Sequence, residues 1–172
     1  MIRRFFLMVY CALLHPLTSY AASSIGPESG LALPRFASLK ASETHLRGGP
    51  GYEYPVEWKY HIKAYPIQII DEYGLWRRIK DVDGVEGWVN KQMLSGKRTA
   101  VIIDPAAKLN RRPVADSPFI AQAQKGALVE LISCDPKWCK VEGNHLSGWI
   151  IKPKIWGIEA DEEIKSRSFF SR

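Results

Sequence analysis

The 172-residue chain has little of what catalytic and metal sites are built from. Its four histidines are scattered, and those expected in the mature chain, His45, His61 and His145, have no carboxylate at a diagnostic spacing. No Gly-x-Ser-x-Gly, His-Glu-x-x-His or phosphate-binding glycine loop occurs. These absences argue against an enzyme, so the sequence predicts no catalytic residue, no metal site and no cofactor.

A long hydrophobic run is also missing. The apolar run at residues 5–14 is shorter than the roughly 20 residues that a membrane-spanning helix needs. Arg3 and Arg4 precede it and small residues follow, a pattern typical of a secretory signal peptide over residues 1–21, cleaved after Ala21. An apolar N-terminal strand is the alternative. We therefore expect a periplasmic or secreted protein with no stable membrane insertion after cleavage and no nucleic-acid partner.

Cysteine is scarce, with three in the chain. Cys11 lies in the signal peptide and is expected to be lost with it. Cys134 and Cys139 flank a turn that Asp135-Pro136 initiates between two β-rich runs, so their side chains can approach each other across a hairpin. In an oxidising compartment a disulfide is the expected state. Two free thiols, a nucleophilic cysteine and a metal half-site remain alternatives, and the last would need two further ligands.

Helical periodicity is absent as well. No window of eleven or more residues sustains it between residues 36 and 157. Apolar residues instead alternate or form short runs, as at residues 66–70 and 127–132. Asp83-Gly84 lies between two such runs and favours a hairpin. The sequence therefore predicts an all-β fold of short strands.

What the chain does contain is an internal repeat. Four positions recur in the same order: Leu46 as Leu109, Trp76 as Trp138, Gly87 as Gly148 and Trp88 as Trp149. The offsets are 63, 62, 61 and 61 residues, and so small a drift is expected from changes in loop length between copies. The chain thus holds two copies of one small unit.

The motifs of the first copy resemble those of a known family. A Leu-Arg-x-Gly-Pro-Gly stretch begins at Leu46, and a Trp-Arg-x-Ile stretch followed by Gly-Trp-Val begins at Trp76. Both resemble the bacterial SH3-like (SH3b) family of small β-barrels, in its cell-envelope branch. The resemblance is close over residues 36–96 and weaker over residues 99–157. It implies two tandem small SH3-like β-barrels after the N-terminal signal peptide.

The repeat and the family resemblance suggest the limits of each part of the chain. We place the first SH3-like domain at residues 34–96 and the second at residues 97–158. The short polar junction at residues 96–98 favours docked rather than independent domains. Residues 22–33 read as a flexible lead, and residues 159–172 as a frayed or briefly helical tail.

Aromatic residues fall into two groups. The tryptophans that recur in both copies are expected to pack in the barrel cores. The others crowd the glycine-rich loop of the first copy, where Tyr52 and Tyr54 stand beside Pro50 and Pro55. Aromatic side chains beside proline on a barrel rim can form a shallow platform for an extended peptide or a sugar. We expect Tyr52 and Tyr54 to be exposed and Trp58 to belong to the core.

Positive charge is concentrated in the second copy. Residues 97–158 contain ten basic and five acidic residues, a net charge of +5. Arg111, Arg112, Lys152 and Lys154 are candidates for a basic surface that meets an anionic partner, such as cell-wall carboxylates or lipid headgroups. A merely solvated face is the alternative.

The resemblance implies a non-catalytic, secreted or periplasmic binding module that recognises cell-wall (peptidoglycan) peptide or glycan. No enzyme domain accompanies the repeats, so the role would be that of an adaptor or wall-associated factor. The alternative is a structural or protein–protein interaction protein without wall binding, whose partner is an envelope or host protein. In that case the loop aromatics belong to the core.

Overall fold

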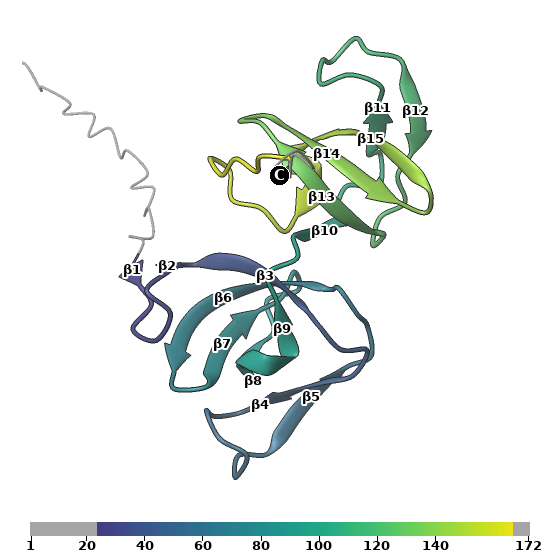
Figure 1. Ribbon diagram of the computed structural model, residues 1–172. Helices are drawn as coiled ribbons and strands as arrows, with labels where there is room; N and C mark the ends of the chain where they lie inside the picture. The colour runs from purple at the N-terminus through teal and green to yellow at the C-terminus, as the bar shows by residue number, and fades with distance from the viewer. Residues whose placement is uncertain (1–23, 167–172) are drawn as a thin grey trace, which may run out of the picture.

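The computed structural model describes residues 24–166, and the predicted signal peptide with Cys11 lies outside these residues. The described chain folds into two seven-stranded antiparallel sheets and one small hairpin (Figure 1). The predicted all-β fold is confirmed. Among residues 24–166, no helix has the length and apolar character needed to cross a membrane.

Module 1 is the first sheet, with strand order β5-β4-β8-β7-β6-β3-β9. Its strands are β3 (Arg35–Leu39), β4 (Thr44–Arg47), β5 (Val56–Tyr60), β6 (Pro66–Tyr73), β7 (Trp76–Lys80), β8 (Glu86–Asn90) and β9 (Leu94–Ser95). A 3₁₀ turn, η1 (Lys91–Met93), joins the last two strands. The side chain of Asn90 caps this turn by accepting a hydrogen bond from the backbone N–H of Gln92 at 3.0 Å.

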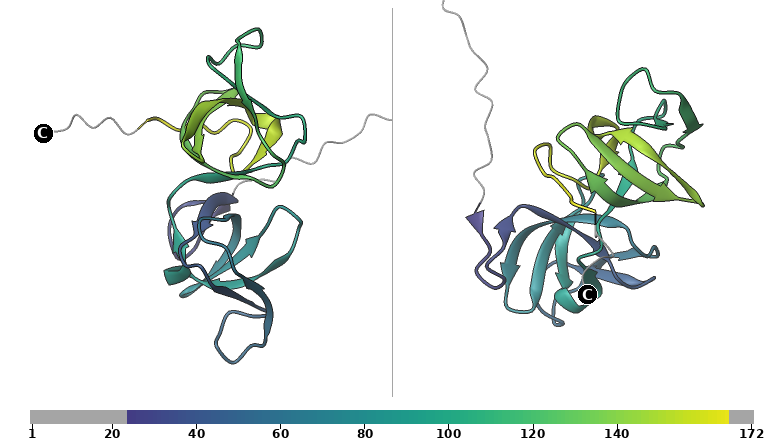
Figure 2. Two further views of the ribbon diagram at one scale, coloured as in Figure 1. Left: turned by 90° about the vertical axis from the view of Figure 1, so that its right-hand side faces the viewer. Right: turned by 45° about the horizontal axis from the view of Figure 1, so that its top comes forward.

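Module 2 is the second sheet, with the equivalent order β12-β11-β15-β14-β13-β10-β16. Its strands are β10 (Thr99–Ile102), β11 (Lys108–Asn110), β12 (Phe119–Gln122), β13 (Leu128–Cys134), β14 (Trp138–Gly143), β15 (Leu146–Ile151) and β16 (Ile155–Trp156). The turn η2 (Lys152–Lys154) matches η1. Seen end-on, the strands of module 2 wrap into a ring (Figure 2). The shared topology confirms that the sequence repeat is a structural repeat.

Contacts within each core explain why the repeat motifs recur together. In module 1, a Cβ added to Gly87 would lie 2.6 Å from Cγ of the buried Leu46. In module 2, a Cβ added to Gly148 would lie 2.9 Å from Cβ of Leu109. The glycine of each Gly-Trp motif therefore allows strands β8 and β15 to pass closely over the leucine that begins the repeat. Aliphatic side chains fill each core, among them Ile79 in module 1.

The recurring tryptophans do not share one environment. Trp76 is buried, at 8% exposure, as expected of a core residue. Trp88, Trp138 and Trp149 are half-buried, so they lie at the margin of the barrels. A module of about 60 residues encloses too little volume to bury several indole rings completely.

The lead expected to be flexible is instead folded from Ser24 onward. Strands β1 (Ser24–Ile25) and β2 (Ala32–Leu33) pair as an antiparallel hairpin, and Leu33 enters the module 1 core. The carboxylate of Glu72 accepts hydrogen bonds from the backbone N–H of Glu28 at 3.0 Å and of Ser29 at 2.8 Å. The composition of residues 22–33 favours flexibility, but the carboxylate of Glu72, which is distant in the sequence, holds the hairpin in place.

Glu72 also closes a buried ion cluster. Its side chain is fully buried and pairs with Arg35 at 2.6 Å and with Arg77 at 3.3 Å. Burial alone would raise the pKa of Glu72, but the hydrogen bonds from Ser29, Arg35 and the hairpin backbone outweigh it and lower the pKa to about 2. The hairpin is thus attached to module 1 by a carboxylate that stays ionised at neutral pH.

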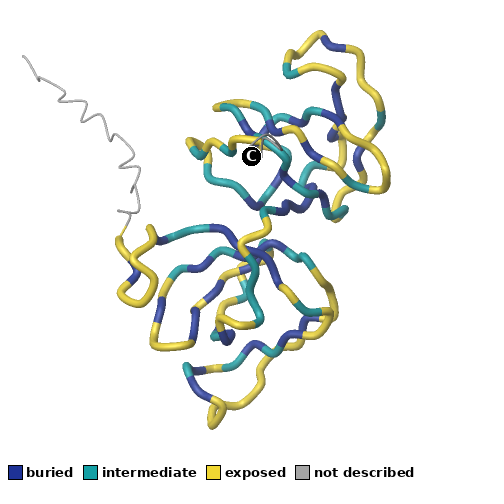
Figure 3. The backbone as a smooth tube through the Cα atoms, in the orientation of Figure 1, coloured by how far each residue is buried: buried dark blue, intermediate teal, exposed yellow. Residues whose placement is uncertain are grey.

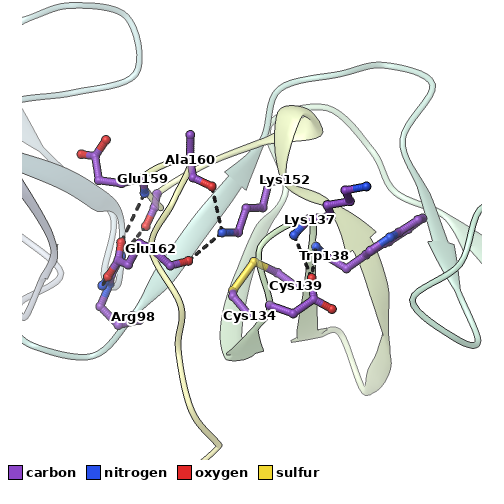
Figure 4. Close-up of a disulfide and its surroundings, with 11 residues drawn as sticks. Arg98, Cys134, Lys137, Trp138, Cys139, Lys152, Glu159, Ala160 and Glu162 are labelled. Atoms are coloured by element: carbon purple, nitrogen blue, oxygen red, sulfur yellow. Dashed lines mark hydrogen bonds and ion pairs between the residues drawn. A yellow bond between two sulfur atoms is a disulfide. The ribbon is translucent and has the colours of Figure 1, made fainter. Parts of the chain in front are cut away.

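The tail expected to be frayed or helical is likewise ordered as far as residue 166. Cys134 and Ile164 form an isolated antiparallel bridge, with backbone hydrogen bonds of 2.8 and 3.0 Å in the two directions. The ammonium group of Lys152 donates to the carbonyl oxygens of Ala160 and Glu162 at 3.1 and 2.6 Å (Figure 4). We call residues 158–166 the C-terminal strap.

The two modules are in contact at their junction. The rings of Phe36 in module 1 and Trp156 in module 2 meet edge to face, with centroids 4.9 Å apart. The guanidinium of Arg98 lies 5.9 Å from the centroid of the Phe36 ring. The hydroxyl of Thr99 donates to the carbonyl of Ala64 at 2.8 Å. These contacts agree with the docked arrangement that the short junction favours.

The C-terminal strap adds polar contacts across this junction. The amide of Gln68 in module 1 donates to the carboxylate of Glu159 at 2.7 Å. Arg98 makes a bidentate pair with Glu162, one bond of which measures 3.0 Å. Burial alone would raise the pKa of Glu162, but the hydrogen bonds and charge of Arg98 lower it overall. The strap therefore holds module 1, the junction and module 2 together.

Candidate functional site

The β4–β5 loop, residues 48–55, protrudes from module 1 (Figures 1 and 3). Tyr52 is 71% exposed and Tyr54 is 41% exposed, as the sequence led us to expect. Pro55 is also exposed, whereas Pro50 is half-buried. The ring of Tyr54 lies directly over Gly49, where any Cβ would collide with it. The glycine at this position therefore lets an aromatic ring approach the backbone closely.

Arg47, the last residue of β4, fixes this loop. Its Nη1 donates to the carbonyl of Tyr52 at 3.1 Å and to that of Tyr54 at 2.7 Å. Its guanidinium carbon also lies 5.5 Å from the centroid of the Tyr52 ring, within the range of a cation–π contact. The arginine of the Leu-Arg motif thus orders an exposed loop.

The Tyr52 ring forms one wall of a pocket. It meets the ring of Trp76 at an interplanar angle of 72°, with centroids 5.0 Å apart. The side-chain amide of Asn90 donates to the Tyr52 hydroxyl at 3.4 Å. The pocket has a volume of about 180 Å³, and Glu43, His45, Arg47 and Met93 complete its lining. It combines two aromatic rings with polar groups of both charge signs.

Strand β4 places its polar residues on this pocket. Thr44 and Leu46 are buried, whereas His45 and Arg47 alternate with them and are half-buried. Since side chains alternate across a strand, the core pattern of β4 sends His45 and Arg47 to the pocket side. Sequence reasoning missed His45 as a site residue, although this alternation could have indicated it.

Glu43 lies at the rim of the pocket beside two histidines. Its carboxylate is 3.1 Å from Nε2 of His45 and 3.7 Å from Nδ1 of His61. All three side chains are substantially exposed to solvent. Over residues 24–166, no group of three or more histidine, cysteine, aspartate or glutamate side chains is arranged to hold a metal ion. The cluster places a carboxylate and two imidazole rings at or beside the rim of the pocket.

The expectation that Trp58 belongs to the core is wrong. Its side chain is 52% exposed on β5, an edge strand whose pairing partner within the sheet is β4. Val56 on the same strand is 37% exposed. Trp58 pairs with the buried Leu46, but β5 is the last strand of the sheet, so no other strand within residues 24–166 covers its outer side.

The four basic candidates do not form one surface. Arg111 and Arg112 are exposed in the β11–β12 loop. Lys154 lies 3.7 Å from Asp104, which partly neutralises it. Lys152 is 6% exposed and its ammonium group serves the C-terminal strap, so its assignment to a basic surface is wrong. The sequence showed its charge but not the carbonyl groups that surround it.

Cys134 and Cys139 are joined by a disulfide across the β13–β14 turn, with their Cα atoms 4.1 Å apart (Figure 4). The carboxylate of Asp135 accepts hydrogen bonds from the backbone N–H groups of Lys137 and Trp138 at 2.8 and 2.7 Å. This aspartate closes the turn locally and brings the two cysteines opposite each other. The disulfide stands at the point where the C-terminal strap pairs with Cys134.

Comparison with protein families places the fold. The model of the bacterial SH3 domain matches twice, over residues 40–96 and 104–157. The chain belongs to the bacterial SH3 domain family. Each match falls on one module, so the protein carries tandem bacterial SH3 domains. No curated protein matches this chain.

Solved structures similar to this bacterial SH3 protein include NlpC2 from Trichomonas vaginalis, at 9% identity and a TM-score of 0.33, covering 72% of this chain and 48% of that one. NlpC1 from the same organism has 9% identity and a TM-score of 0.33, covering 76% and 48% of the two chains. An NlpC/P60 family protein from Bacillus cereus has 13% identity and a TM-score of 0.32, covering 70% and 55%. The chain spans about half the length of these proteins.

Proposed function

We propose that this protein is a non-catalytic cell-wall binding module of the periplasm or the cell exterior, and that the Tyr52 pocket of module 1 recognises a peptide or glycan of peptidoglycan. Bacterial SH3 domains are commonly cell-wall binding modules. The observation that carries the proposal is Tyr52 itself. Tyr52 is 71% exposed, yet its carbonyl and its ring are both held in place.

A fixed, exposed aromatic residue suits ligand binding for a physical reason. Association costs conformational entropy for each side chain that becomes ordered, and Tyr52 is already ordered by Arg47 and Trp76. The apolar faces of the rings can cover the hydrocarbon part of a peptide or a sugar. Glu43, His45 and Asn90 at the same pocket can exchange hydrogen bonds with its polar groups.

Sedimentation with purified, protein-free peptidoglycan tests the proposal. Replacing both Tyr52 and Tyr54 by alanine should weaken retention by about 1 kcal/mol or more, roughly fivefold, because truncated interface aromatics typically cost that much. The melting temperature should hardly change, since both side chains are exposed. Tyr73→Ala is the matched control, because Tyr73 is 65% exposed at the end of β6 and does not line the pocket.

Salt dependence supplies a second test. The exposed Arg111 and Arg112 of module 2 should add a weak attraction to anionic wall polymers, screened over about 8 Å at physiological ionic strength. Retention should therefore decrease as salt rises, and decrease further in the tyrosine double variant. Wild-type protein that ignores peptidoglycan even at low salt would overturn the proposal.

A second candidate is a protein-binding role without wall binding, with an envelope or host protein as partner. The observation that favours it is the exposed apolar edge of β5, where Val56 and Trp58 stand at a strand edge that no other strand of residues 24–166 pairs with. Such edges accept extended peptide segments as an added strand. This role predicts that Trp58→Arg abolishes binding to the protein partner, that the Tyr52 and Tyr54 replacements do not, and that peptidoglycan is not retained.

A further inference from the structure

Module 2 contains a second cavity, which is separate from the Tyr52 pocket and has about 410 Å³ of space. It lies where η2 and β16 meet the β13–β14 turn and the C-terminal strap. Four isoleucines, two prolines and Ala160 form its apolar walls. Its volume falls in the range of roughly 300–1,000 Å³ that is usual for small-ligand sites.

One wall of this cavity comes from outside the repeated module. Ile158 and Ala160 belong to the C-terminal strap, beyond the residues 104–157 that match the bacterial SH3 domain. The strap is held against module 2 by the ammonium of Lys152, which binds the carbonyls of Ala160 and Glu162 (Figure 4). This wall is therefore in place before any ligand binds, and it comes from a segment outside the part of the chain that matches the bacterial SH3 domain.

The polar groups of the cavity are few. Among its lining residues, Lys137 and Lys152 have polar side chains. Lys152 is buried and occupied by the strap carbonyls. Lys137 is exposed in the β13–β14 turn, and within residues 24–166 its ammonium group makes no hydrogen bond or ion pair. The cavity thus presents aliphatic walls and one free positive charge.

We propose that this cavity binds an aliphatic carboxylate, with the hydrocarbon chain between the isoleucines and the strap and the carboxylate at Lys137. A peptide fits less well, because each residue brings an amide donor and an acceptor that must be paired when buried, and the aliphatic walls offer no side-chain partners for them. An amphiphile with a single anionic group needs one cation, and Lys137 supplies it. The net charge of +5 over residues 97–158 also favours a negatively charged ligand.

Titration of the full chain with fatty acids, followed by its amide NMR signals, tests this assignment. Hexanoate, octanoate and decanoate, kept below their micelle concentrations, should perturb the signals of Ile103, Ile158 and Ala160. Affinity should rise by up to about fourfold per added methylene until the cavity is filled. The uncharged 1-octanol should bind more weakly than octanoate. Shifts that miss these residues, or affinity independent of chain length, would refute the site.

Two variants separate the contribution of the Lys137 charge to binding from that of the apolar cavity. Lys137→Gln should weaken octanoate binding about two- to fivefold, the usual size of an exposed ion pair, and leave 1-octanol unaffected. Lys140→Gln is its matched control, because Lys140 is exposed on β14 and does not line the cavity. Ala160→Phe should fill the cavity and abolish binding of both probes, and since Ala160 is exposed the fold should tolerate it. Unchanged binding in Ala160→Phe would overturn the proposal.

Vesicles distinguish a free fatty acid from a lipid acyl chain as the source. Phosphatidylglycerol vesicles that displace octanoate, with a loss of binding in Ala160→Phe, would identify a membrane lipid as the ligand. Octanoate binding without vesicle binding would identify a free carboxylate. Vesicle binding that survives Ala160→Phe while octanoate fails to bind would contradict the cavity and point to a purely electrostatic surface. Peptidoglycan retention should be unchanged in Ala160→Phe, which conserves the charge of module 2, so this proposal stands or fails apart from wall binding.

Discussion

Replacing Glu72 by glutamine tests how the N-terminal hairpin is held, because it removes one charge and nearly conserves the shape of the side chain. The carboxylate is fully buried and serves Arg35, Arg77 and the backbone of the β1–β2 hairpin at once. Glutamine keeps one acceptor oxygen but leaves two arginines without a counter-charge. We expect module 1 to lose stability and the hairpin to detach first.

Two related considerations give the expected loss of stability. The pKa of Glu72 falls from its ordinary value of 4.5 to about 2 on folding, a difference of more than two units. Since one unit corresponds to about 1.4 kcal/mol, ionised Glu72 stabilises the fold by about 3 kcal/mol. Removing one partner of a buried ion pair typically costs about 3–5 kcal/mol. We therefore expect Glu72→Gln to lower the unfolding free energy at pH 7 by about 3 kcal/mol.

The pH dependence has a definite sign. A carboxylate whose pKa is lowered by folding contributes its full stabilisation above pH 4.5 and loses it as the pH falls towards 2. Urea unfolding, followed by NMR signals of β6 and β7, should show that the difference in unfolding free energy between wild type and Glu72→Gln shrinks over this pH interval. Glu57→Gln, which removes an exposed carboxylate, should show no such gap. A gap of constant size from pH 7 to pH 2.5 would refute this account of the cluster.

Two further predictions concern module 2. Cys139→Ser should lower its unfolding free energy by about 2 kcal/mol without abolishing the fold, because the disulfide closes a short loop. Mature protein, from which the predicted signal peptide with Cys11 has been cleaved, should carry no thiol that alkylation detects in mass spectrometry without prior reduction. Glu162→Gln should accelerate hydrogen exchange at the Ile164 amide about tenfold, since the strap loses its charged contact with Arg98. Glu163→Gln, which removes an exposed carboxylate in the strap, should leave this rate unchanged, and acceleration there would contradict the mechanism.

The sequence by itself determined the repeat and the all-β fold, and it made the pairing of Cys134 with Cys139 the expected state. Each of these features can be read from the order and spacing of residues along the chain. Strand and turn patterns are local, and Leu46 and Gly87 keep their spacing because they touch in the finished barrel. Tyr52 was also accessible to sequence reasoning, since it stands beside proline and glycine in a loop whose aromatic residues have no clear counterpart in the second copy.

Only the tertiary structure decided the burial and the partners of several other polar and aromatic side chains. Trp58 is a large apolar residue of the kind that usually fills a core, but it lies exposed on β5, the last strand of its sheet. Lys152 has the charge of a surface residue but is enclosed by carbonyls of the strap eight and ten residues later. The residues around Ser29 look flexible until Glu72, 43 residues away, binds them. Burial and pairing are set by contacts between segments distant in the chain, and local composition does not record them.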